Sequence, residues 1–158
     1  MRKRQKGFSL IELLIVVAII LIIASIAVPS LIAAKRNANE TAAIGALRTI
    51  NAVQISYSSS YPATGYASTL GALGGTSCAP PTSVSACLLD SQTASGTKSG
   101  YTFTLTGVSG TPAVTYQVIA APSVPNQTGT RYFCSTNDGV LHASFSAITT
   151  CDTSVSPL

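Results

Sequence analysis

The sequence predicts an α+β fold, in which one long N-terminal helix packs on an antiparallel sheet of three or four strands. Residues 8–28 are apolar almost without a break. Apolar residues then recur at helical spacing as far as Tyr57, which indicates a helix that continues with one apolar face. From residue 101 onward the apolar spacing changes to two, which is typical of strands.

The composition separates an apolar segment and a cationic leader from a nearly neutral remainder. Only 9% of the residues are charged, whereas soluble domains average about 25%. The formal net charge of +4 comes from Arg2, Lys3, Arg4 and Lys6, because the five basic residues after them match the five acidic ones. The basic balance therefore predicts no specific nucleic-acid partner, and the leader charges favour a cytoplasmic N-terminus.

The first half of the predicted helix suits a membrane, apart from one carboxylate. A helix from Phe8 to Ile32 would measure about 37 Å, which is enough to cross a bilayer. Glu12 lies inside this stretch, where a charge costs roughly 2.5–3.5 kcal/mol at the centre of the hydrocarbon. A helix that served only as an anchor would not be expected to carry Glu12.

A secretory signal peptide would also begin with a short cationic segment. Its apolar region is usually about 7–15 residues long and ends at a small-residue cleavage site, for which Ser25-Ile26-Ala27 is a poor candidate. The length of the apolar stretch and the presence of Glu12 count against this alternative. It would make the chain a secreted or membrane-anchored binding domain.

We expect one helix from about Phe8 to about Tyr57, with a kink at Pro29, because proline removes a helical hydrogen bond. Its second half places Arg48, Asn51 and Gln54 between the apolar positions. The predicted organisation is a leader over residues 1–7, a membrane-spanning helix over 8–30 and a periplasmic or extracellular globular head over 31–158. The expected apolar stripe of the second half consists of Ala43, Ala46, Leu47, Ile50, Val53 and Tyr57.

Residues 62–100 are rich in glycine and proline and predict an irregular connector, with a possible helical turn at 68–73. The chain contains four cysteines, for which three pairings exist, and we favour the local pairs Cys78–Cys87 and Cys134–Cys151. Such bridges typically contribute about 2–4 kcal/mol. Four reduced, buried thiols are the alternative.

Alternating apolar residues predict strands near 101–106, 114–119, 131–134 and 140–143. Asn137-Asp138-Gly139 is a strong tight-turn signal between the last two. Tyr116 and Val118 fall on the expected apolar face with Val114, whereas Ile119 falls on the polar face. The tail to Leu158 has no regular pattern.

The sequence contains little that points to catalysis. It lacks the nucleophile-elbow, zincin and phosphate-loop motifs, and its one histidine, His142, lies in a predicted strand. Zinc is not expected either, because no Cys-x-x-Cys occurs. We therefore predict no enzyme, catalytic residue, metal or cofactor.

The segment Gly7-Phe8-Ser9-Leu10-Ile11-Glu12, with the apolar run to Pro29, closely resembles the N-terminus of type IV pilins and pseudopilins. The later run from Leu47 to Pro62 is also similar to pilin helix ends. The strand region agrees with the family only in class. Many pilins carry a glycine in the middle of the apolar helix, whereas residues 18–24 here contain none, so local unwinding would be smaller or confined to the turn before Pro29.

The resemblance implies that prepilin peptidase cuts between Gly7 and Phe8 and that the new amine of Phe8 is methylated. It further implies that Glu12 of one subunit meets the Phe8 amine of its neighbour in a staggered helical bundle. At about 4 Å and an effective dielectric near 20, such charges attract by about 4 kcal/mol.

The implied function is that of a structural subunit of a type IV pilus, and a minor pilin or a type II secretion pseudopilin is the alternative. The implied partners are identical subunits in a helical filament, prepilin peptidase, the inner-membrane pilus assembly machinery and, before assembly, membrane lipid. The precursor would reside in the inner membrane and the mature subunit in a cell-surface filament.

Overall fold

The structure is a computed structural model that describes residues 8–75, 78–152 and 154–158. Contacts within the chain divide it into two units, of which one ends at Lys35 and the other, called the head below, covers Arg36–Leu158. Helix α1, Leu10–Ser60, contributes its first part to the N-terminal unit and its second part to the head.

In the N-terminal unit, α1 exposes nearly every side chain. From Phe8 to Lys35 only Ala24 is even half-buried. The helix is long and apolar enough to cross a membrane, with a mean hydropathy of 3.1 over its most apolar 18-residue window. Pro29 lies inside α1, and the kink expected there stays a prediction.

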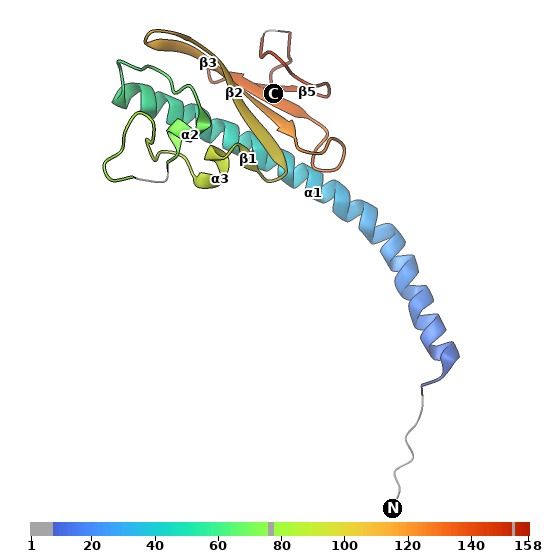
Figure 1. Ribbon diagram of the computed structural model, residues 1–158. Coiled ribbons are helices and arrows are strands. Elements are labelled where there is room, and N and C mark those ends of the chain that lie inside the picture. Colours follow the sequence, from blue (N-terminus) through green and yellow to red (C-terminus); the bar gives the residue numbers. More distant parts are fainter. Residues whose placement is uncertain (1–7, 76–77, 153) are drawn as a thin grey trace, which may run out of the picture. The chain divides into compact units, whose positions relative to one another are not determined.

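In the head, the second part of α1 packs on one face of the sheet (Figure 1). Leu47 and Ile50 are completely buried, and Tyr57 is buried as well. The amphipathic stripe predicted from the sequence is therefore confirmed. Asn51 and Gln54, which stand between the apolar positions in the sequence, are also buried, and hydrogen bonds to the packed layer satisfy their amides.

The sheet is antiparallel and its strands are adjacent in chain order. The predicted α+β fold is confirmed, with five strands in place of three or four. The additional strand is β1, which has two residues and is too short to show an alternating pattern. The strands are β1 (Thr97–Lys98), β2 (Tyr101–Gly110), β3 (Ala113–Pro122), β4 (Tyr132–Thr136) and β5 (Leu141–Ser144).

The sheet face toward α1 carries large side chains at alternate positions. Tyr101 and Phe103 of β2, and Tyr116 and Val118 of β3, are buried in one core with the helix stripe. Val114 was expected on this face but is 62% exposed. The pairing of β2 with β3 is irregular near the hairpin that joins them, so the alternation ends before Val114.

The opposite sheet face is covered in part by the C-terminal segment. Ile119, which was expected on a polar face, is buried there with Cys134 and Cys151. The tail also bonds to the edge strand, because Ala143 N–H donates to Ser156 O at 2.9 Å. The C-terminal segment is therefore a fixed cover of the sheet, although its sequence shows no regular pattern.

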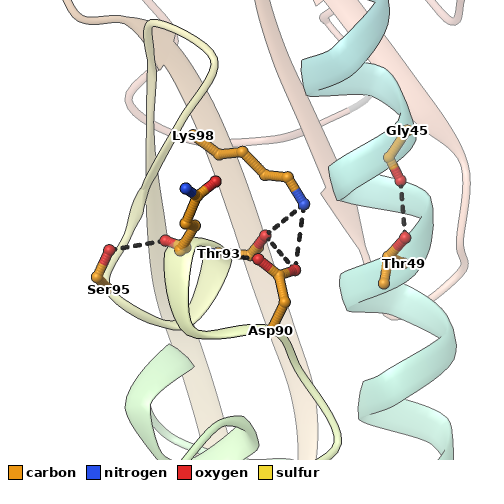
Figure 2. A network of polar contacts seen from close by, with 7 residues as sticks. Gly45, Thr49, Asp90, Thr93, Ser95 and Lys98 are labelled. Carbon is orange, nitrogen blue, oxygen red and sulfur yellow. Dashed lines mark hydrogen bonds and ion pairs between the residues drawn. The ribbon is translucent and has the colours of Figure 1, made fainter.

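Two short helices, α2 (Leu70–Leu73) and α3 (Ser91–Ala94), order the connector. Helix α2 falls inside the predicted turn, whereas α3 was not predicted. Asp90 caps α3 by accepting from Thr93 N–H at 3.1 Å, and the Lys98 ammonium reaches Asp90 at 3.1 Å and the Thr93 hydroxyl at 3.2 Å (Figure 2). An aspartate at the N-cap was the available sequence signal.

The expectation of disulfides is confirmed. The bonds are Cys78–Cys87 and Cys134–Cys151, which is the local pairing that the sequence favoured. The first closes a loop in the connector. The second fixes the C-terminal segment to β4, next to buried Ile119.

Candidate functional site

The candidate site begins at Phe8, two residues before α1. Leu13 N–H donates to Ser9 O at 3.2 Å, so the helical bonding starts directly behind Phe8. Glu12 lies in the first turn of α1 and is exposed. Its charge is favourable there, because the unpaired N–H groups at a helix N-terminus make that end electropositive. Gly7 lies outside the described residues.

Glu12 has no cationic partner among the residues that the structure describes. In those residues the ion pairs join Lys98 to Asp90 and Arg131 to Glu40. A carboxylate in an apolar environment is costly unless it is paired. The described residues therefore provide no ion-pair partner for Glu12.

The surface around Glu12 is apolar and uncovered. Contiguous exposed apolar patches beyond a few hundred Å² mark interaction or membrane surfaces in proteins. This segment therefore has the surface of a part that is buried by lipid or by other chains. The exposed large apolar residues are Phe8, Leu10, Ile11, Leu13, Leu14, Ile15, Val16, Val17, Ile19, Ile20, Leu21, Ile22, Ile23, Ile26, Val28, Leu31 and Ile32.

A second carboxylate of α1, Glu40, has a different environment. Its Oε1 accepts from the N–H and the hydroxyl of Thr130 at 2.8 and 2.9 Å, and its Oε2 accepts from Arg131 Nε at 2.7 Å. Arg131 N–H also donates to Oε1, at 3.3 Å. Only 4% of the Glu40 side chain is exposed.

Burial by itself raises the pKa of Glu40, but the hydrogen bonds from Thr130 and Arg131 outweigh it, so the pKa lies below its ordinary value. The carboxylate therefore stays ionised and fastens α1 to the segment between β3 and β4. Asn39 supports the same connection, because its Nδ2 donates to Thr128 O at 2.8 Å. This role of Glu40 was not predicted from the sequence. An acidic residue in register with Ala43 and Leu47 was the available signal.

Two buried amides fix α1 further along the head. Asn51 donates to Ser135 Oγ at 2.7 Å and accepts from the Tyr116 hydroxyl at 3.1 Å. Gln54 exchanges two hydrogen bonds with the backbone of Ala67. Burial raises the pKa of Tyr116 to about 12, so its hydroxyl remains a donor to Asn51. These bonds hold the register of the helix on the sheet.

His142, considered above as the lone histidine, makes a structural bond. Its Nδ1 lies 2.6 Å from Val155 O, which ties the C-terminal segment to β5. Within the described residues, no group of three or more His, Cys, Asp or Glu is placed to hold a metal ion.

Comparison with known proteins identifies the N-terminal segment. Residues 2–28 match the family described as "Prokaryotic N-terminal methylation motif", and the match includes Gly7, Phe8 and Glu12. The chain carries the N-terminal segment of the type IV pilin family. The resemblance found at residues 7–12 is thereby confirmed.

A known pilus protein is also similar to this chain, over a longer stretch than the motif. The chain is 56% identical over 39 residues to the "Type IV wide pilus major component PilA4" of Thermus thermophilus. The match covers 25% of this chain and 30% of that protein, so it spans less than a third of the relative. No solved structure matches the chain. The similarity therefore concerns the pilin segment, and the head is known from its own structure.

Proposed function

We propose that this chain is a structural subunit of a type IV pilus that polymerises through the apolar part of α1. One observation carries the proposal. An exposed apolar helix, whose Glu12 has no ion-pair partner in the described residues, is joined to a head with a buried core of its own. The matches to the methylation motif and to a pilus component support it.

The energetics of the apolar surface favour assembly over exposure to water. Burying one Leu or Ile side chain contributes about 1.5–3 kcal/mol, and this segment exposes more than a dozen large apolar side chains. In this proposal the inner membrane covers them in the precursor, and neighbouring helices cover them in the filament. Both environments are dry, so transfer between them need not expose the segment to water.

Processing supplies the missing charge. Cleavage between Gly7 and Phe8 by prepilin peptidase would leave an amine on Phe8, and methylation of an amine keeps its positive charge. In a staggered bundle this amine would meet Glu12 of a neighbour, with an attraction of about 4 kcal/mol at about 4 Å. The pair would neutralise both groups and set the offset between subunits.

Mass spectrometry of the mature protein tests this proposal. We expect a chain that begins at Phe8 and carries one additional methyl group, recovered in filaments sheared from the cell surface. Gly7→Arg should leave the leader attached, because a long charged side chain replaces the residue at the scissile bond. A mature chain that begins at Val28 would instead indicate signal peptidase and would contradict the pilus role.

The abundance of the chain in sheared filaments decides its place in the assembly. A major pilin should dominate the sheared material. A minor pilin or a type II secretion pseudopilin should be scarce there, although it would share the cleavage site and the assembly machinery of the inner membrane.

A further inference from the structure

The charges of the head are paired only in part. The head contains four Lys or Arg residues and four Asp or Glu residues. Lys98 pairs with Asp90 at 3.1 Å, and Arg131 pairs with Glu40 at 2.7 Å. Within the described residues of the head, the charged side chains outside these pairs are Arg36, Arg48, Asp138 and Asp152.

The remaining charges are segregated by sign. Arg36 and Arg48 both lie on α1. Asp138 and Asp152 both line one groove between the β4–β5 turn and the C-terminal segment. Among its described residues, the head therefore presents its unpaired cations on α1 and its unpaired anions at the groove.

The groove has a volume of about 480 Å³ and combines the two carboxylates with an apolar wall. Asp138 accepts from the Thr136 hydroxyl at 2.7 Å and from Val140 N–H at 2.9 Å, and Asp152 accepts from Ser154 N–H and from the Ser154 hydroxyl. These bonds hold the pKa of each carboxyl below its ordinary value, so both are ionised. The groove is lined by Thr136, Asp138, Val140, His142, Cys151, Asp152, Val155 and Pro157.

Such a groove suits a side chain with an apolar stem and a cationic end. Arginine and lysine bury their methylene stems along apolar surface while their charged ends seek carboxylates or water. Val140, Val155 and Pro157 can cover the stem, while Asp138 and Asp152 attract the charge. The His142 bond to Val155 O fixes the wall that carries Val155.

The complementary surface is the outer α1 face, which we define as the exposed residues Gly45, Arg48, Thr49, Ala52 and Ile55. A Cβ at Gly45 would meet no described atom within 4 Å, so the packing of the head does not require glycine there. Glycine inside a helix costs about 0.5–1 kcal/mol relative to alanine. The Thr49 hydroxyl donates to Gly45 O at 3.0 Å (Figure 2), so it is already paired within the helix.

We infer that the outer α1 face of one copy docks on the groove of a second copy, with Arg48 entering between Asp138 and Asp152. Arg48 is exposed and can reach a second copy, whereas Arg36 is half-buried. The contact joins two different surfaces, and such heterologous contacts build open helical assemblies when they do not close into rings. The inference rests on the proposed function, since it describes how the heads pack in the filament.

Cysteine cross-linking in assembled filaments tests the contact. Gly45→Cys combined with Val140→Cys places one thiol on each surface, since Val140 lines the groove and is 44% exposed. After mild oxidation we expect a ladder of covalent multimers on a non-reducing gel. The matched control combines Gly45→Cys with Thr102→Cys, an exposed position of β2, and should remain largely monomeric.

Charge exchange tests the role of Arg48. Arg48→Asp should reduce the yield of sheared filaments about tenfold or more, because like charges then face each other across the contact. Adding Asp138→Lys and Asp152→Lys should restore much of the yield. Thermal unfolding of each variant, as the full mature chain in detergent micelles, shows whether the head still folds.

The outcomes separate this inference from the proposed function. If the unchanged chain forms no filaments, the proposed function fails. If filaments form and depend on Glu12, yet Arg48→Asp is neutral or the ladder is absent, the docking contact is wrong and the pilus role stands. Loss of filaments in Arg48→Asp without rescue by the exchanged charges would assign Arg48 to another partner and would also overturn the contact.

Discussion

Helix α1 carries two carboxylates whose surroundings differ completely. Glu40 lies in the head, is buried, and receives four hydrogen bonds from Thr130 and Arg131. Glu12 lies in the N-terminal unit, is exposed, and has no ion-pair partner among the described residues. The charge of Glu40 is therefore compensated inside the head, whereas no described ion pair compensates the charge of Glu12.

The two environments indicate where each residue acts. Glu40 is buried and accepts four hydrogen bonds, so losing it leaves these donors of Thr130 and Arg131 without their acceptor, and the cost falls on the folding of the head. In the proposed filament, losing Glu12 leaves the Phe8 amine of another subunit without its counter-charge. The cost of that change then falls on assembly. Glu40 is thus a stability residue, and in the proposed filament Glu12 is an assembly residue.

The strongest test of this comparison is Glu12→Ala. We expect normal membrane insertion, because removing a charge from an apolar segment lowers its cost in lipid, together with an almost complete loss of filaments. Membrane fractionation and the yield of sheared filaments measure the two effects. Glu12→Gln keeps the side-chain length without the charge and should fail in the same way. Normal filaments in either variant would show that the proposed pairing is wrong.

Glu40→Ala should impair the folding of the head rather than assembly, and its effect should be smaller than that of Glu12→Ala. We expect a loss of about 2–4 kcal/mol in the free energy of unfolding, because the bonded groups of Thr130 and Arg131 lose their acceptor. The matched control is Lys98→Ala, which breaks a more exposed ion pair and should cost about 0–1 kcal/mol. Denaturant unfolding of the mature protein in micelles compares them. Equal losses in the two variants would contradict the distinction between the buried carboxylate of Glu40 and the more exposed carboxylate of Asp90.

The sequence predicted those parts of the fold whose residues repeat with a clear period. Leu47 and Ile50 follow a helical period, and Tyr101 and Phe103 follow a strand period, so the helix stripe and the central strands were predictable. Ile119 was assigned to the wrong environment, because a distant C-terminal segment covers it and no local pattern reports that contact. Strand β1 has too few residues for any period.

The candidate site, too, could be predicted only in part from the sequence. Glu12 is conspicuous because its neighbours in sequence are apolar, and that contrast is visible in the chain alone. Glu40 is not conspicuous, because it stands beside Asn39 and Thr41 and resembles an ordinary solvent-facing residue. Its partners Thr130 and Arg131 follow it by 90 and 91 residues, a pairing that only the folded chain creates. The burial of Asn51 and Gln54 was not predicted for the same reason, since their partners also lie elsewhere in the chain.

The smallest expected effect is the pH dependence of the Glu40 contribution. Because the pKa of folded Glu40 lies below its unfolded value of about 4.3, the ionised carboxylate stabilises the head above that pH. The contribution is lost as the pH falls through the folded pKa. Asp90, Asp138 and Asp152 also have lowered pKa values and act in the same direction, so the total pH profile alone does not isolate Glu40. Glu40→Gln isolates it, since an amide does not titrate in this range. The difference in melting temperature between the two proteins should be constant from about pH 7 to about pH 5 and should shrink at lower pH, whereas parallel profiles would contradict a lowered pKa at Glu40.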